Sequence, residues 1–138
     1  MVHQKAPPGY EPVELGSGFS AVSGRTLVHR RSRKLVSRIA ERHANSRGVR
    51  HGGALATFAD AQIVVVKPRA AEADNRPTIS ATIDDLAPNP LGAWVAAEVT
   101  LGRTQTLIFS QAVMTAGGEP LARSSAIYRT TKQTGGRT

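Results

Sequence analysis

One stretch of the chain, HGGALATFADAQIVVV at residues 51–66, controls how the rest can fold. Its apolar residues show no strand-like alternation, and Pro68 follows two residues beyond its end, so we expect a helix over about residues 52–66. Small side chains on this helix would let a sheet approach it closely; they are Ala54, Ala56, Ala59 and Ala61.

Asp60 is the only acidic residue in this stretch. An ionised carboxylate is costly to bury unless it is paired, although Asp60 could also be an ordinary exposed helix residue. At the other end, Gly52 and Gly53 would begin the helix, where unpaired backbone N–H groups meet the positive end of the helix dipole. A polarising helix end and a lone acid are both parts of an acyl-transfer site. Alternatively, the two glycines mark only a tight entry into the helix.

The length of 138 residues predicts one domain, with a flexible leader at 1–18, a folded domain at 19–131 and a flexible tail at 132–138. The absence of Cys excludes disulfides, thiolate metal sites and a cysteine nucleophile. The four His residues have no ligand spacing with carboxylates, so we expect no metal. No apolar run approaches the roughly 18 residues of a membrane span, and a cytoplasmic protein without membrane contact is expected.

The net charge of +8 is unevenly placed, because nine of the eighteen Lys and Arg residues lie in 25–50, against one acid, Glu41. Such a region attracts nucleic acid, a membrane surface or a phosphorylated small molecule, or it is simply a solvated face. Nucleic-acid binding is disfavoured, because an aromatic content of 4% is too low for a base-stacking platform and no recognised motif is present.

Strands are expected on both sides of the helix. Alternating or β-favouring residues predict four of them after it, at 78–84, 93–101, 106–115 and 121–129, in an antiparallel meander. One mostly apolar helix with such strands indicates an α+β fold, a curved antiparallel sheet wrapped around one central helix. Residues 35–44 do not fit this pattern of strands around one helix. Their apolar pairs recur every four residues, which locally predicts a second helix.

The stretch NSRGVRHGGALATFAD, residues 45–60, resembles the signature of hotdog-fold acyl-CoA thioesterases of the PaaI-like group, in the 4-hydroxybenzoyl-CoA thioesterase superfamily. Similar stretches follow at 86–88, 102–104 and 118–122, so the resemblance covers roughly residues 24–130. It implies the hotdog fold, and it implies an outer strand over Lys34 to His43 instead of a helix. The hydratase branch of the fold is disfavoured, because its helix signature of an Asp with a His is absent.

The resemblance also implies roles for individual residues. The Gly53 N–H would polarise a thioester carbonyl, and Asp60 would act as general base or as nucleophile. Asn45 would orient the water or the carbonyl, and Thr78 could hold the water near Asp60. His51 belongs to the same motif. Two simpler interpretations stay open, in which His51 is a helix cap and Asn45 a turn residue.

Geometry adds a condition, because Gly53 and Asp60 share a helix face but lie about 10 Å apart along its axis. If both act on one bond, they must come from two subunits whose helices run antiparallel. We therefore expect a homodimer with two shared sites, and the resemblance further implies a homotetramer.

The basic residues then fit the phosphates of coenzyme A, which is part of the substrate, so no separate cofactor is expected. Candidate phosphate-binding residues are Arg103, Thr104, Arg47 and Arg50, and candidates for the acyl pocket are Ala61, Gln62, Val65 and Trp94. The acyl group itself is not predicted. The main alternative is a hotdog protein that binds acyl-CoA without hydrolysing it, and a basic nucleic-acid-binding module is the weaker one.

Overall fold

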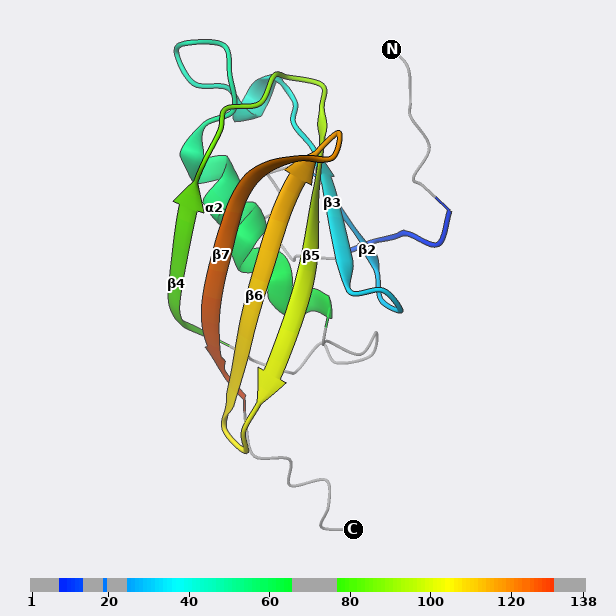
Figure 1. Ribbon diagram of the computed structural model, residues 1–138, viewed down its shortest axis with the longest axis vertical. Coiled ribbons are helices and arrows are strands. Elements are labelled where there is room, and N and C mark those ends of the chain that lie inside the picture. Colours follow the sequence, from blue (N-terminus) through cyan, green and yellow to red (C-terminus); the bar gives the residue numbers. More distant parts are fainter. Residues whose placement is uncertain (1–7, 14–18, 20–24, 66–76, 131–138) are drawn as a thin grey trace.

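A computed structural model describes residues 8–13, 19, 25–65 and 77–130, which form one antiparallel sheet and a helix that lies across it (Figure 1). The sheet has seven strands in the order β1-β2-β3-β5-β6-β7-β4. The strands are β1 (Glu11–Pro12), β2 (Thr26–His29), β3 (Lys34–Arg38), β4 (Thr78–Asp85), β5 (Trp94–Arg103), β6 (Leu107–Ala116) and β7 (Glu119–Arg129). The helical segments are η1 (Glu41–His43), α2 (Gly52–Asp60) and η2 (Ala61–Val65), of which η1 and η2 are 3₁₀ turns.

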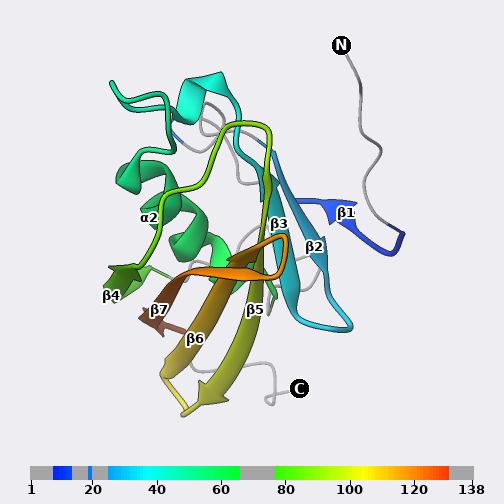
Figure 2. The same ribbon diagram turned by 45° about the horizontal axis from the view of Figure 1, so that its top comes forward.

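Helix α2 is held against the sheet by its apolar face. The side chains of Leu55, Phe58 and Ala59 are buried and join one core cluster with inward residues of the strands, among them Val95 and Met114. Burying a side chain the size of Leu or Phe contributes about 1.5–3 kcal/mol. Figure 2 shows the sheet curving around α2. The predicted α+β arrangement, a curved sheet around one central helix as in the hotdog fold, is confirmed.

The expected helix over about 52–66 is confirmed as two consecutive pieces. The regular α-helix ends at Asp60, and the chain continues as a 3₁₀ turn to Val65. Pro68, which was expected to close the helix, lies outside the described residues. The change of geometry after Asp60 matters for the site, because Asp60 stands at the end of α2.

The local prediction of a helix at 35–44 is wrong. Residues Lys34–Arg38 form β3, and only Glu41–His43 make a helical turn. Leu35, Val36 and Ser37 are all buried, so this strand is covered on both faces and lacks the alternation that identifies a half-buried strand. The strand implied by the resemblance is confirmed for Lys34–Arg38, but it is not an outer strand, because β3 pairs with both β2 and β5.

The four later strands are confirmed within one to two residues, but they do not form a simple meander. Strands β5, β6 and β7 follow one another, whereas β4 pairs with β7 and β5 pairs with β3. Helix α2 carries the chain across the sheet before β4 begins, which places β4 at the far edge, beyond β7 (Figure 1). Seven of the eight residues of β4 are exposed.

The expected leader and tail lie mostly outside the described residues. Within the leader, Glu11 and Pro12 pair with β2, and Glu11 forms a 2.8 Å ion pair with Arg30. No helix in the described part of the chain has the length and apolar character needed to span a bilayer.

Candidate functional site

Asp60 and Thr78 meet although they are eighteen residues apart. Asp60 ends α2, Thr78 begins β4, and the Thr78 hydroxyl donates a hydrogen bond of 2.7 Å to Asp60 Oδ1. Both residues are exposed in the single chain. The structure therefore brings together two residues that the sequence assigned to one site, and it leaves the Asp60 carboxylate open on one side.

Tyr128 lies beneath this pair and was missed by sequence reasoning. Its side chain is fully buried, and its hydroxyl donates a 2.9 Å hydrogen bond to the backbone carbonyl of Asp60. Burial, and to a smaller extent the Asp60 carboxylate, raise the pKa of Tyr128 above its ordinary value, so the hydroxyl keeps its proton. Tyr128 thus fixes the end of α2. The only signal in the sequence was its position in the predicted strand 121–129.

Gln62 is part of the same support and not of an acyl pocket. Its side chain is buried, its Nε2 donates to Ser124 Oγ at 3.2 Å, and its Oε1 accepts from the Ser110 hydroxyl. These bonds tie the segment after α2 to β6 and β7. The sequence-based placement of Gln62 in a substrate pocket does not fit this arrangement, because both ends of its amide are bonded to the sheet.

At the opposite end of α2, His51 caps the helix. Its Nδ1 accepts a 2.8 Å hydrogen bond from the Gly53 N–H, and its carbonyl accepts from the Ala54 N–H at 3.0 Å. A Cβ atom at Gly53 would lie only 3.0 Å from His51 Nδ1, so a larger residue there would push the His51 ring from its present place. The capping interpretation of His51 agrees with the structure, and the Gly53 N–H is occupied in this conformation.

The Gly52 N–H has no hydrogen-bond partner among residues 8–13, 25–65 and 77–130. It is the first N–H of α2, it belongs to an exposed residue, and it lies at the positive end of the helix dipole. Gly52 and Asp60 bracket this nine-residue helix and are therefore about 12 Å apart along its axis. One chain alone does not bring the open donor and the carboxylate to the same bond.

Asn45 shapes the loop before the helix. Its Oδ1 accepts hydrogen bonds from the backbone N–H groups of Arg47 at 2.9 Å and of Val49 at 3.3 Å. The carbonyl oxygen of its side chain is thereby used within the turn, as the simpler interpretation of Asn45 expected. Its role in orienting water or a carbonyl stays a prediction.

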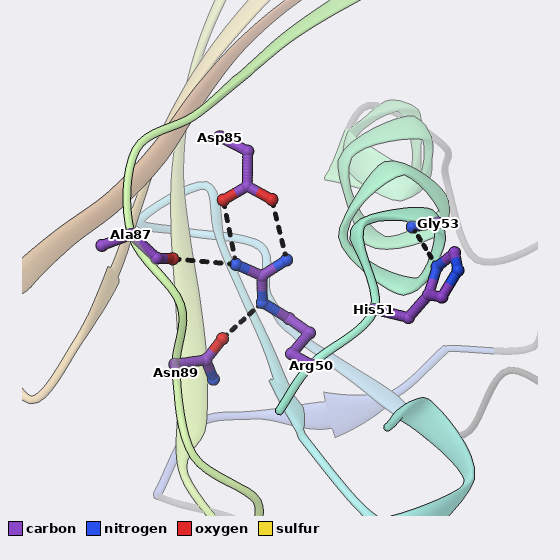
Figure 3. Close-up of polar contacts among 6 residues, drawn as sticks. All are labelled: Arg50, His51, Gly53, Asp85, Ala87 and Asn89. Atoms are coloured by element: carbon purple, nitrogen blue, oxygen red, sulfur yellow. Dashed lines mark hydrogen bonds and ion pairs between the residues drawn. The ribbon is translucent and has the colours of Figure 1, made fainter. Parts of the chain in front are cut away.

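Among the four candidates for phosphate binding, Arg50 has little freedom. It is 4% exposed, and its guanidinium contacts Asp85 at 3.1 Å, the Ala87 carbonyl at 3.1 Å and the Asn89 side chain (Figure 3). A role in binding coenzyme A does not fit this placement, because its donors are bonded inside the protein. Arg47, in the same loop, is exposed.

Arg103 and Thr104 lie at the other end of the sheet. The register runs from Arg103 through Ile108 and Tyr128 to Thr78, so Arg103 shares a cross-strand row with Thr78. Arg103 is exposed, whereas the Thr104 hydroxyl accepts a 3.0 Å hydrogen bond from the Leu107 N–H and closes the turn between β5 and β6.

A small hollow, partly open to solvent and with a cavity volume of about 20 Å³, lies between α2 and strands β2, β3 and β5. Its apolar wall includes Ile39, Phe58 and Val95, and its polar wall includes Thr26, Ser37 and His43. None of Ala61, Gln62, Val65 and Trp94, which were expected around an acyl group, lines this hollow. In the described ranges, no three His, Asp or Glu side chains gather as metal ligands would.

Comparison with known proteins gives similarity in structure only, because neither a family model nor a curated protein sequence matches this chain. A hypothetical thioesterase from Streptococcus pneumoniae, solved with coenzyme A, has a TM-score of 0.64 at 16% identity, covering 91% of both chains. Zebra fish thioesterase superfamily member 2 has a TM-score of 0.66 at 16% identity, covering 85% of this chain and 89% of its own.

A variant of the phenylacetic acid degradation protein PaaI from Thermus thermophilus has a TM-score of 0.62 at 16% identity, and covers 88% of this chain and 93% of its own. At such identities the similarity establishes the fold. The fold is the one shared by PaaI-like and other hotdog thioesterases, as the resemblance of residues 45–60 implied.

Proposed function

We propose that this protein is an acyl-CoA thioesterase that hydrolyses a thioester at sites shared between two subunits. The observation that carries the proposal is the pairing of Asp60 with Thr78 at one end of α2 and the open Gly52 N–H at the other. The carboxylate can accept a proton from water, and the N–H can stabilise an oxyanion. Both contributions lower the barrier to hydrolysis of an acyl compound.

Gly52 and Asp60 lie about 12 Å apart in one chain, so both can act on one bond only if a second subunit supplies one of them. If two copies place their α2 helices antiparallel and side by side, the donor end of one helix lies beside the Asp60 end of the other, and two equivalent sites form. The exposed edge strand β4 supports such pairing, because its unpaired backbone groups can extend the sheet into a second copy. A tetramer would need a further contact, for which Phe109 and Val113, exposed on the outer face of β6, are candidates.

In the proposed reaction, the Asp60 carboxylate accepts a proton from a water molecule that the Thr78 hydroxyl helps to position. The water oxygen attacks the thioester carbonyl carbon, and the oxyanion that forms is stabilised by the partner's helix N-terminus. The carbon–sulfur bond then breaks, and the thiolate of coenzyme A takes up a proton. Direct attack by Asp60, giving a mixed anhydride that water hydrolyses, uses the same arrangement.

We assign the oxyanion donor to Gly52 in the present conformation. The Gly53 N–H, favoured by the motif, would become available only if the His51 ring turned away from its 2.8 Å hydrogen bond. Removing a donor of this kind typically costs about 3–4 kcal/mol of transition-state stabilisation.

The coenzyme A phosphates would bind at the rim between subunits. Arg47 and Arg103 are both exposed, one at the Gly52 end of the chain and one at the Asp60 end. Antiparallel pairing would bring these two ends together around each site. Coenzyme A in the pneumococcal structure of the same fold supports a ligand of this class.

A second candidate is a protein that binds acyl-CoA without hydrolysing it, favoured by the capped Gly53 N–H. Thiol release from a panel of acyl-CoA thioesters, measured with the wild type and with Asp60→Asn, separates the two. The enzyme predicts turnover by the wild type, with loss of turnover and retained acyl-CoA binding in Asp60→Asn. Binding without turnover by the wild type would establish the second candidate and overturn the first.

A further inference from the structure

Arg50 is a buried cation two residues before the helix donor, and it lies against a carboxylate. Its guanidinium binds Asp85 through Nη2 at 3.1 Å and through Nη1 at 3.4 Å (Figure 3). The Arg50 side chain is 1% exposed and that of Asp85 is 43% exposed. The pair is therefore anchored on the Arg50 side and open to solvent on the Asp85 side.

Asp85 also faces the first residue of α2. A Cβ atom at Gly52 would lie 3.8 Å from Asp85 Oδ2, so this carboxylate is next to the helix donor end. A negative charge there opposes the build-up of a second negative charge on a substrate oxygen. The guanidinium of Arg50, bound to the same carboxylate, offsets this effect.

We propose that Arg50 is a positioning residue that neutralises Asp85 beside the Gly52 N–H and so keeps this helix end able to stabilise an oxyanion. The inference rests on the proposed thioesterase function. It assigns Arg50 to the control of the site through Asp85, not to contact with substrate. Since Asp85 ends the edge strand β4, the same pair also connects the donor to the strand expected at the subunit interface.

The chain offers a matched control one residue away. Asp84 forms a 2.9 Å ion pair with Arg123, in which both side chains are more than half exposed. Asp84 pairs in register with Arg123, and Asp85 pairs with Ala122. Because the two are consecutive residues of a strand, their carboxylates project from opposite faces of β4. Asp84→Asn removes an ion pair from the same strand end without changing the charge at Gly52.

The test compares Arg50→Met, Arg50→Lys, Asp85→Asn and the double variant Arg50→Met/Asp85→Asn by the kcat and KM of thioester hydrolysis. We expect Arg50→Met to lower kcat about 100-fold with little change in KM, because Asp85 is left uncompensated. The double variant also lacks the negative charge of Asp85, so its kcat should be about tenfold higher than that of Arg50→Met. Arg50→Lys keeps the positive charge at position 50 and should retain most of kcat. Asp85→Asn and Asp84→Asn should not lower kcat.

A double variant no faster than Arg50→Met, or a large loss of kcat in Asp85→Asn, would show that the pair only supports the fold and would overturn the inference. If Arg50→Met does not fold, Arg50→Gln takes its place, because it removes the positive charge and keeps a hydrogen-bond donor; it should lower kcat, and removal of the Asp85 charge in Arg50→Gln/Asp85→Asn should restore part of the loss. The NMR chemical shift of the Gly52 amide is a measurement that does not depend on catalytic activity. Asp85→Asn should move it and Asp84→Asn should not. If the wild type hydrolyses no thioester, the proposed function fails, while this shift still tests the pairing of charges at Gly52.

Discussion

The Thr78 hydroxyl donates a 2.7 Å hydrogen bond to the Asp60 carboxylate and thereby joins the first residue of β4 to the last residue of α2. A hydrogen bond to a charged acceptor is stronger than one between neutral groups. It holds the carboxylate at a fixed place beside the exposed edge of the sheet. In the proposed dimer, this is where the partner's helix donor would arrive.

Replacing Thr78 tests this bond. We expect Thr78→Val to lower kcat about 10- to 100-fold, because a hydrogen bond to a charged group contributes about 1.5–3 kcal/mol. Thr78→Ser keeps the hydroxyl and should retain most of the activity. Steady-state hydrolysis of one thioester by both variants is the measurement, and equal activity of Val and Ser at this position would contradict the role given to Thr78.

The donor is tested by proline at position 52. Proline is well tolerated at the first position of a helix and lacks the N–H, while the extended backbone of His51, at φ −70° and ψ 138°, suits a residue before proline. We expect Gly52→Pro to lower kcat about 100- to 1000-fold with little loss of helix, since the oxyanion loses its donor. Gly52→Ala, which keeps the N–H, is the control. Unchanged kcat in Gly52→Pro, with circular dichroism like the wild type, would return the assignment to Gly53.

His51 is expected to matter first for stability. Loss of a capping side chain in His51→Ala should lower the free energy of unfolding by about 1 kcal/mol, because the Gly53 N–H loses its acceptor. His51→Asn supplies another capping acceptor and should recover most of this loss. Urea unfolding of the three proteins measures it, and identical stability of His51→Ala and the wild type would show that the cap contributes nothing.

Tyr128→Phe should destabilise the protein by about 1 kcal/mol at neutral pH, because the Asp60 carbonyl loses a buried donor. The raised pKa of Tyr128 adds a pH dependence. The unfolded chain releases the tyrosine proton near pH 10 while the folded protein retains it, so the contribution is complete below about pH 10 and declines above it.

Urea unfolding at about pH 8 and about pH 11 should therefore show the wild type losing more stability than Tyr128→Phe, since all other groups are common to both proteins. A parallel decline in the two proteins would mean that Tyr128 does not hold its proton in the folded state.

The sequence predicted those parts of the fold that follow from local pattern. The run after Gly52 has no alternation and marked the helix, and alternation marked the strands near Thr78 and Trp94. The pattern failed at Leu35, because β3 is buried on both faces and its periodicity is hidden. It could not show that β4 pairs with β7, because the order of strands depends on how the chain crosses the sheet.

The site divides in the same way. Asp60, Thr78 and the glycines were found from spacing and resemblance, and the structure brings Asp60 and Thr78 into contact. Arg50 was placed among phosphate ligands because a sequence does not show which Arg is buried against a carboxylate. Tyr128 was missed because its partner is a backbone carbonyl, which leaves no trace in residue identity.

The most direct test of a shared centre is a mixed oligomer of Asp60→Asn and Gly52→Pro subunits, each expected to lose at least about 99% of kcat when it is alone. If each site takes Asp60 from one subunit and the Gly52 N–H from its partner, a mixed dimer has one intact site and one with both defects. Co-expression with two affinity tags, followed by isolation of the mixed species, should then give about half the wild-type kcat per dimer. No recovery of hydrolysis in the isolated mixed dimer would contradict the account, because it would mean that the acid and the donor act within one chain or not on the same bond.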